Sequence, residues 1–352
     1  MSNPVTFEIT VSPTDWRHAV HVLPHQLRQW AGQVDDVQFT LNLQQRAGRY
    51  GTAADEGLRT LRALLDELCE RHPNAHVVEV DTSDAARAAV SERFLGGRPV
   101  PLKNHDGGPY YSYLFGWHAA RNDLVLHTDS DMLFGGGSQA WVGEALEVLR
   151  TRDDVLCTAP LPGPPTADGV LPERVRAQHA RMGGEPRREP LDSLAYRLHG
   201  CSTRLWLFDR ATLSRRLGGM PVEAPRLRSA LRARVEGNPP VELPEKSMSR
   251  RMNELGLYRV DLLGSGAGMW SVHPTMRSEE FYAALPELVA RVESGDVPDA
   301  QRGDYDLNDS MVDWTSAREA LRRQTWPRRL ARRATRPVLQ RAQQVQRARA
   351  AR

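Results

Sequence analysis

Apolar residues along the chain recur with two different periods: every second residue in some segments and every third or fourth residue in others. The two kinds of segment alternate along the chain. Strict alternation predicts strands, and apolar residues spaced three or four apart predict helices. In the first third of the chain we expect strands over residues 7–11, 37–43 and 76–80 and helices over residues 15–30, 55–71 and 83–94. This succession indicates an α/β fold with a mostly parallel sheet flanked by helices.

The succession continues through the rest of the chain, interrupted by loops rich in glycine and proline. We expect further helices over residues 110–121, 139–150, 211–217, 226–235 and 245–255, and further strands from residue 124 and over residues 155–160, 203–208 and 258–263. We expect loops over residues 46–51, 96–108, 163–189 and 264–273, with one helix near residues 173–182.

One predicted strand, Leu124-Val125-Leu126-His127-Thr128, ends in Asp129-Ser130-Asp131 and is followed by three glycines after Phe134. Ligands of open α/β sheets bind at the carboxyl ends of the strands. Two carboxylates there suit Mg²⁺ or Mn²⁺, which would in turn hold a diphosphate. We expect Asp131 to bind the metal directly and Asp129 to contact the metal or a ribose. The alternative is a solvated acidic turn.

Composition narrows the class of protein. Of 352 residues, 40% are hydrophobic and 26% charged, which is typical of a soluble globular chain. An apolar stretch of about 18 residues is lacking, so we expect no transmembrane helix, and the N-terminus has no signal pattern. The sparse, odd number of cysteines fits a reducing cytosol, so we expect a cytoplasmic protein. The three cysteines, Cys69, Cys157 and Cys201, are far apart and show no metal-binding spacing.

Charge is distributed unevenly along the chain. Residues 320–352 contain 11 arginines and no acid, so of the net charge of +3 the rest of the chain carries −8. We expect the basic tail, residues 327–352, to be helical or disordered. It is either solvated without a partner or bound to an anionic membrane surface, which would place the protein peripherally at the inner face of a membrane. Because it lacks interleaved aromatic residues, we do not expect nucleic acid as its partner.

Four motifs in order give the chain a family resemblance over about residues 5–275: Ser12-Pro13-Thr14-Asp15, Asp129-Ser130-Asp131, Glu242-Leu243-Pro244-Glu245, and Trp270-Ser271-Val272-His273. The chain resembles nucleotide-diphospho-sugar glycosyltransferases of the GT-A fold, most like the inverting family 2 type. The resemblance implies a Rossmann-like GT-A domain that moves a sugar from a nucleotide-diphosphate donor to an unknown acceptor hydroxyl, with Mn²⁺ or Mg²⁺ as cofactor.

The resemblance also implies roles for single residues. The donor contacts would be Pro13, Thr14, Asp15, Lys103, Gly107, Asp129 and Trp270. The metal ligands would be Asp129, Asp131 and His273. Glu245, with Glu242 as the alternative, would take the acceptor's proton. The implied domains are a catalytic domain over residues 1–275, with a donor half to residue 137 and an acceptor half from residue 138, a helical extension over residues 276–326, and the basic tail.

For several of these residues, elementary chemistry also allows a purely structural role. Glu245 at a helix start is favoured as a carboxylate by the helix dipole, whether or not it acts as a base. His273 completes a metal site or is merely packed. Trp270 stacks on a sugar or lies in the core. Lys103 and Gly107 approach a phosphate or form a surface turn.

Three other functions stay open on the sequence. A haloacid-dehalogenase-type phosphohydrolase would use Asp129 as nucleophile and Asp131 as acid and base, with Asp304 and Asp309 binding Mg²⁺; its acidic motif, however, follows the first strand. A nucleotidyltransferase would need a glycine-rich loop after the first strand, where this chain has Ser12-Pro13-Thr14-Asp15. A membrane or RNA adaptor driven by the tail would leave the acidic motif unexplained.

Overall fold

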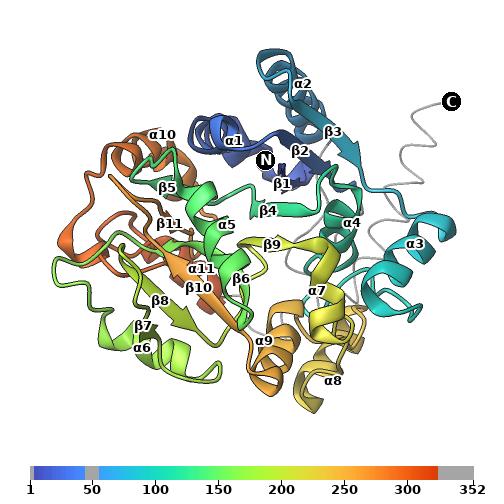
Figure 1. The fold of residues 1–352 in the computed structure, drawn as a ribbon. Helices are drawn as coiled ribbons and strands as arrows, with labels where there is room; N and C mark the ends of the chain where they lie inside the picture. The colour runs from blue at the N-terminus through green and yellow to red at the C-terminus, as the bar shows by residue number, and fades with distance from the viewer. Residues whose placement is uncertain (1–3, 44–54, 324–352) are drawn as a thin grey trace, which may run out of the picture.

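The structure is a computed structural model that describes residues 4–43 and 55–323 (Figure 1). Its strands form an eleven-stranded sheet with the main order β3-β2-β1-β4-β9-β6-β10-β8-β7, to which β11 and β5 are added at β6. The strands are β1 (Val5–Val11), β2 (Asp36–Leu41), β3 (Ala75–Glu79), β4 (Leu124–Asp129), β5 (Leu133–Gly135), β6 (Val155–Pro162), β7 (Arg187–Arg188), β8 (Ala195–Leu198), β9 (Leu205–Asp209), β10 (Tyr258–Leu262) and β11 (Trp270–Val272).

Helices connect the strands and cover both faces of the sheet (Figure 1). They are α1 (Trp16–Trp30), α2 (Asp55–Arg71), α3 (Asp84–Leu95), α4 (Tyr111–Ala119), α5 (Trp141–Thr151), α6 (Glu173–Ala180), α7 (Arg210–Leu217), α8 (Leu227–Glu236), α9 (Pro244–Leu255), α10 (Glu279–Ser294) and α11 (Thr315–Arg323), with short 3₁₀ turns η1 (Pro13–Asp15), η2 (Ala31–Gln33) and η4 (Asp299–Gln301). Among the described residues, none of these helices is long and apolar enough to cross a membrane.

The N-terminal half of the sheet is parallel, with β1 between β2 and β4. Alternate residues of β1 face two separate cores: Phe7 and Ile9 pack against α1 and α2, and the buried polar Glu8 and Thr10 point the other way. Burying an aromatic or branched side chain contributes about 1.5–3 kcal/mol. The alternation that predicted this strand therefore reflects two buried faces, one of which is polar.

Beyond β4 the sheet is mixed. β9 is antiparallel to both β4 and β6, whereas β6 and β10 run parallel, and β8 closes antiparallel on β10. The predicted α/β class, with a mostly parallel central sheet flanked by helices, is confirmed. Two predicted helix ends are also confirmed: Asp209 caps α7 by accepting from the backbone N–H of Ala211 at 2.8 Å, and Gly256 ends α9 with φ of 67°.

Four short strands were not predicted. β5, β7, β8 and β11 have too few residues to show a period; β7 falls inside the loop predicted over residues 163–189, and β11 falls inside the loop predicted over residues 264–273. β11 pairs with β5 and places Trp270 opposite Gly135. The predicted loop therefore ends at residue 269, four residues earlier than its composition suggests, because pairing with a distant strand decides its conformation.

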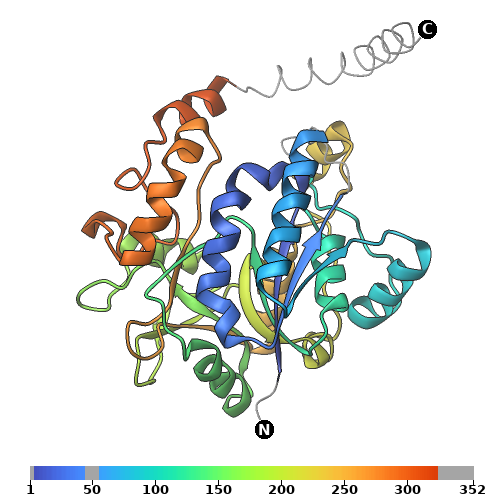
Figure 2. The ribbon, with the colours of Figure 1, turned by 90° about the horizontal axis from the view of Figure 1, so that it is seen from above.

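The segment after β11 returns to the N-terminal half of the molecule. α10 packs beside α1, which in turn packs beside α2, as the view from above shows (Figure 2). Arg17 pairs with Glu279 at 2.6 Å, and His25 lies 2.6 Å from Glu293. The chain therefore brings residues 273–278 to the end of β1. The loop predicted over residues 46–51 and the basic tail, residues 327–352, lie outside the described residues.

Candidate active site

The acidic motif lies at the carboxyl end of β4, as predicted. β4 ends at Asp129, and the backbone N–H of Met132 donates to the Asp129 carbonyl at 3.3 Å, which closes a tight turn. From α1, the Gln26 side-chain amide donates to the carbonyls of Asp129 and Met132, each at 2.9 Å. His18 Nε2 lies 3.0 Å from Ser130 Oγ. Side chains of α1 therefore fix the shape of this turn.

Asp131 is buried and paired with an arginine from far along the chain. Arg277 contacts Asp131 Oδ2 through Nε at 3.1 Å and Nη2 at 2.6 Å, and its Nη1 donates to Asp15 Oδ1 at 2.9 Å. Asp15 in turn accepts from the Ser12 backbone N–H at 2.8 Å. One guanidinium therefore bridges the ends of β1 and β4, and charge-assisted bonds of this kind are about twice as strong as neutral ones.

The two acids of the motif differ in electrostatics. Burial and the neighbouring charge of Asp131 raise the pKa of Asp129 to about 6, although the Tyr113 hydroxyl donates to Asp129 Oδ1 at 2.7 Å. Burial acts to raise the pKa of Asp131 as well, but the charge and hydrogen bonds of Arg277 act the other way, and the pKa lies well below its ordinary value. Asp131 is therefore the fixed anion of the pair.

His273 joins the same cluster from the end of β11. Its Nε2 lies 3.7 Å from Asp131 Oδ2, its Nδ1 lies 3.1 Å from Arg204 Nη1, and its ring stacks on Tyr305 with 5.8 Å between ring centres. Burial, followed by the charge of Arg204, lowers the pKa of His273, so the ring is neutral near pH 7. The predicted proximity of His273 to Asp131 is present in the structure.

Behind the turn lies a buried polar pair that the sequence did not indicate. Glu8 of β1 and His127 of β4 are both fully buried and hydrogen-bonded to each other through Oε2 and Nδ1. The Thr10 hydroxyl also donates to Glu8, at 3.0 Å, and His127 Nε2 lies 4.0 Å from Asp129 Oδ1. This buried hydrogen-bonded pair therefore places fixed polar groups next to Asp129.

The two glutamates before and within α9 have different surroundings. Glu242 is buried, accepts from the backbone N–H of Leu243 at 3.0 Å and lies 3.6 Å from His105 Nδ1. Glu245 is half-buried in the first turn of α9 and accepts from the Thr203 hydroxyl at 3.4 Å. Glu242 is thus held inside the protein, and Glu245 is the carboxylate that an outside group can reach.

Electrostatics connect Glu245 with the acidic turn. The hydroxyl of Tyr113, whose pKa is raised by burial and then by Asp129, also responds to the charge of Glu245. Burial raises the pKa of Glu245, and the charge of Arg204, which also acts on Asp129, opposes that rise. Tyr113 and Arg204 therefore lie within electrostatic range of both carboxylates.

The remaining predicted donor contacts fall in three places. Asp15, in η1 with Pro13 and Thr14, is drawn into the site by Arg277, and the Thr14 hydroxyl lies 2.9 Å from that of Ser12. The loop with Lys103 and Gly107 packs against the segment before α9, because the His105 backbone N–H donates to the Val241 carbonyl at 2.7 Å. This loop therefore lies beside Glu242.

Trp270 requires a correction. The ring is buried in a hydrophobic core and lies against Gly135, where even a Cβ would come within 2.0 Å of it. A ring enclosed in this way offers no open face to a sugar. Of the two alternatives for Trp270, the structure supports packing in the core.

Sequence reasoning missed Arg277, Arg204 and Tyr113, which together contact all three predicted members of the acidic cluster. Each contact joins residues at least 16 positions apart, and the Arg277–Asp131 contact spans 146 positions. No local period reports such contacts. The only signal for Arg277 was a basic residue shortly after the last family-like motif.

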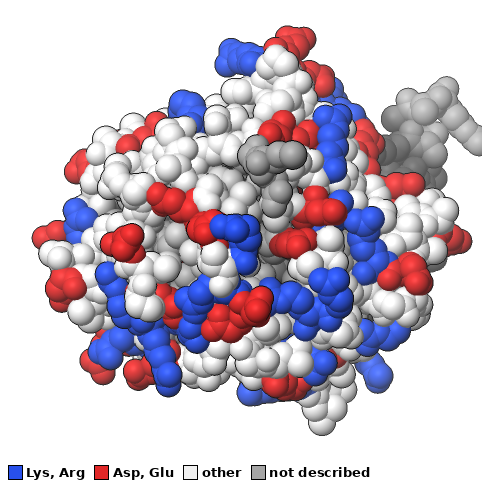
Figure 3. All heavy atoms as spheres, viewed as in Figure 1, with Lys and Arg blue, Asp and Glu red and all other residues white. Residues whose placement is uncertain are grey.

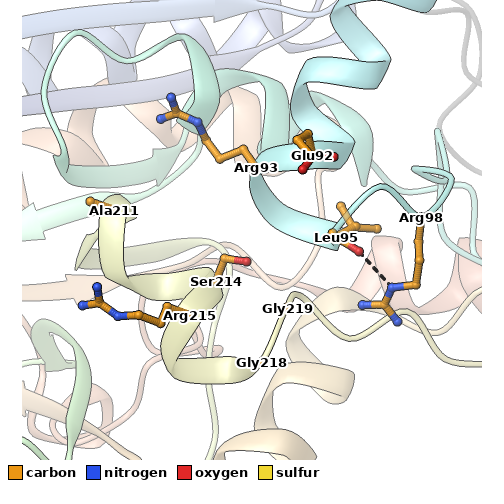
Figure 4. A pocket seen from close by; sticks show the side chains of 10 residues that line it. Glu92, Arg93, Leu95, Arg98, Ala211, Ser214, Arg215, Gly218 and Gly219 are labelled. Carbon is orange, nitrogen blue, oxygen red and sulfur yellow. Dashed lines mark hydrogen bonds between the residues drawn. The ribbon is translucent and has the colours of Figure 1, made fainter.

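A separate open pocket of about 590 Å³ lies between the end of α3 and α7 (Figure 4). Its lining includes Arg93, Arg98, Arg215 and Ser214, and its glycines lie at the helix ends. None of the residues of the acidic cluster lines it. The pocket and the acidic cluster are therefore distinct features of the surface.

The comparisons with known proteins rest on structure alone. No family model matches the sequence, and no curated protein matches it. One similar solved structure is GalNAc-T7 with UDP, GalNAc and Mn²⁺: identity is 11%, coverage is 84% of this chain and 52% of that chain, and the TM-score is 0.46. The present chain thus spans about half the length of the GalNAc-T7 chain.

Two further solved structures are similar. Glucosyl-3-phosphoglycerate synthase from Mycobacterium tuberculosis, with Mn²⁺, UDP and glucosyl-3-phosphoglycerate, is 12% identical over 83% of this chain and 78% of that chain, with a TM-score of 0.35. The mannosyltransferase PcManGT from Pyrobaculum calidifontis, with GDP-Man and Mn²⁺, is 15% identical over 75% and 59%, with a TM-score of 0.35. At such TM-scores the similarity assigns no activity. The solved structures named here are nucleotide-sugar glycosyltransferases, the class that the sequence motifs of this chain resemble.

Proposed function

We propose that this protein is a metal-dependent glycosyltransferase that moves a sugar from a nucleotide-diphosphate donor to an acceptor hydroxyl, with inversion at the sugar carbon. The observation that carries the proposal is the buried turn with Asp129 and Asp131 at the carboxyl end of β4, with Arg277 and Arg204 beside it. A diphosphate leaving group gains negative charge as it departs, and fixed positive groups at a strand end stabilise that charge.

The residues fit a divalent cation. Asp131 Oδ1 is buried and has no hydrogen-bond partner among the described residues, and a bare carboxylate oxygen is the ligand that Mg²⁺ and Mn²⁺ prefer. Asp131 would hold the ion, with Asp129 and His273 close by. The described residues offer no group of three or more His, Cys, Asp and Glu side chains for a metal, so donor phosphates and water would complete its coordination. When bound, the ion would neutralise charge on the diphosphate.

Arg204 is the cation best placed to meet a phosphate. It is exposed, and its charge acts on Asp129, Asp131 and Glu245. Arg277, in contrast, is taken up by Asp131 and Asp15 and so orients the metal-binding carboxylate. The planar fork of Arg204 suits phosphate oxygens better than an ammonium would.

Glu245 is the proposed base. Its carboxylate takes the proton of the acceptor hydroxyl while the acceptor oxygen bonds to the sugar carbon and the bond from that carbon to the diphosphate oxygen breaks. Burial raises the pKa of Glu245, which makes it a better proton acceptor than a solvated glutamate. Glu242, enclosed beside His105, lacks this access.

The competing functions receive less support from the residues. A phosphohydrolase would need the carboxylates of Asp304 and Asp309 for its metal, but these pair with Arg174 and with Arg318. A nucleotidyltransferase would need a glycine-rich loop after β1, where η1 is closed instead by the buried Asp15.

Calorimetry with UDP and GDP, with and without Mn²⁺, tests the proposal. We expect one nucleotide diphosphate to bind in the presence of Mn²⁺ and the Asp131→Asn variant to lose that binding with its fold intact. Asp153→Asn, at an exposed carboxylate, is the matched control and should bind normally. Failure of both nucleotides to bind with Mn²⁺, or equal binding by the Asp131 variant, would contradict the proposed site.

A further inference from the structure

Helix α8 presents its apolar side to solvent. Leu227, Leu231 and Val235 are 76%, 55% and 43% exposed, and they lie four residues apart. Residues at this spacing form one stripe along a helix. The face that packs on the protein holds the small Ala233, which is fully buried. The polarity of α8 is thus the reverse of that of an ordinary surface helix, and we call these three residues the α8 stripe.

Arginines border the α8 stripe on both sides. Each residue of an α-helix is rotated by about 100° from the one before it. Viewed down the axis of α8, Arg228 lies about 20° beyond Val235 on one side of the stripe, and Arg234 lies about 20° beyond Leu227 on the other. Both arginines are exposed, as is Arg226 just before the helix, and within the described part of the chain none of the three has an ion pair. Arg232, farther round, is paired with Asp106. The exposed side of α8 is therefore an apolar line between unpaired cations.

The setting of α8 keeps this side turned outward. The Arg232–Asp106 pair and the hydrogen bond from Asn238 Nδ2 to the His105 carbonyl at 3.4 Å fasten α8 to the loop before α4. In Figure 1 α8 lies at the lower edge of the molecule. Figure 3 shows uncharged surface projecting at that edge, with both basic and acidic side chains near it. The surface is a convex ridge.

We propose that the α8 stripe docks on an anionic lipid bilayer. Leu227, Leu231 and Val235 enter the boundary between headgroups and acyl chains, and Arg228 and Arg234 contact lipid phosphates. A basic amphipathic helix that lies in the plane of the interface binds in this way. The proposal is independent of the basic tail and of the proposed glycosyl transfer, since vesicle binding needs no substrate.

A second copy of the chain fits this surface less well. A two-fold dimer through α8 would bring the same patch onto itself and place arginines against arginines. Three exposed apolar side chains on one ridge also fall far short of the roughly 800 Å² per partner that a stable interface buries. Anionic headgroups, by contrast, complement every unpaired charge along the stripe.

Co-sedimentation of the full chain with vesicles of phosphatidylcholine and phosphatidylglycerol, at 0.05 M and 0.5 M salt, tests the proposal. High salt screens binding that is only electrostatic, including any from the tail, but leaves apolar insertion. We expect the double variant Leu227→Asp/Leu231→Asp to bind at least roughly tenfold more weakly at 0.5 M salt, since burying a leucine side chain accounts for that factor or more. The matched control, Val170→Asp/Leu255→Asp, changes two exposed apolar residues elsewhere and should bind as the unmodified chain does.

Hydrogen exchange gives a second measurement. On addition of vesicles, amides of residues 227–236 should gain protection in the unmodified chain and not in the stripe variant. Several outcomes would overturn the proposal: no vesicle binding at 0.5 M salt, equal binding of the stripe variant, or protection confined to other residues. Self-association that the stripe variant abolishes in the absence of vesicles would assign the surface to a second copy instead.

Discussion

The turn after β4 and the start of α9 both present a proposed catalytic carboxylate, but they hold it very differently. Asp131 accepts two hydrogen bonds from Arg277, and the Gln26 side-chain amide holds its turn by two hydrogen bonds of 2.9 Å to backbone carbonyls. Glu245 makes one side-chain hydrogen bond within the described part of the chain, with the Thr203 hydroxyl at 3.4 Å. The donor side is therefore built in advance, and the acceptor side is left adjustable, as suits a base that must meet a hydroxyl arriving from outside.

Neutralising the fixed carboxylate, Asp131, gives the strongest test of the difference between the two carboxylates. Asp131→Asn should lower kcat/KM about 10³-fold, because the variant keeps the shape but loses the charge that holds a metal and opposes Arg277. Steady-state release of the nucleotide diphosphate measures the effect, with Asp153→Asn as control. A loss of less than tenfold would show that the fixed turn is not the donor site.

The adjustable carboxylate should show its role in turnover rather than in binding. Glu245→Gln should lower kcat about 10²-fold or more and leave the donor Kd unchanged, since a lost general base affects only the chemical step. Glu242→Gln is the matched variant: it should reduce thermal stability, because Glu242 is buried beside His105, and lower kcat much less. If the two variants exchange these effects, the base is Glu242.

The pH profile sharpens the same assignment. Because the pKa of Glu245 is raised by burial and only the ionised form accepts a proton, kcat should rise about tenfold per pH unit below that pKa and level off above it. The midpoint should lie above the 4.5 of an ordinary glutamate. In Glu245→Gln this limb should disappear. A limb that persists unchanged in the variant would assign the titration to another group.

The positioning role of Arg277 should have a smaller effect. Arg277→Gln removes the charge that keeps the pKa of Asp131 low, so we expect Mn²⁺-dependent nucleotide binding to weaken about tenfold, and to weaken further as pH falls. Arg277→Lys should recover only part of this loss, because an ammonium cannot reach Asp131 and Asp15 in the same fork geometry. Full recovery by lysine would mean that only the charge matters.

The smallest effect on catalysis should come from Trp270. Trp270→Ala should cost about 3–5 kcal/mol of folding stability, the usual range for a buried aromatic ring, while the donor KM of the folded fraction stays within about twofold. Chemical denaturation and donor titration at low temperature separate the two quantities. A raised donor KM in a stable Trp270→Phe variant would restore the predicted sugar contact.

The sequence was most informative where local pattern and chemistry coincide. The strand that ends in Asp129 was predicted because branched apolar residues, an abrupt acidic turn and glycines follow one another within 14 positions. Trp270 was assigned a role from its neighbours in the chain, yet its place is decided by Gly135, whose missing side chain leaves room for the ring. Arg277 lies beyond the last family-like motif and reaches the site only because α10 packs on α1. The positions of Trp270 and Arg277 depend on long-range packing, which local sequence patterns do not reveal.

The bridge made by Arg277 also orders events during synthesis of the chain. Arg277 is translated 146 residues after Asp131 and 262 residues after Asp15, the two carboxylates it joins. At about 5–20 residues per second, the gap after Asp131 lasts roughly 7–30 s. During that interval the nascent N-terminal half holds these two carboxylates without their arginine, and the repulsion between them opposes closure of the turn. The donor side, though encoded first, therefore becomes complete only after the last quarter of the protein has begun to emerge.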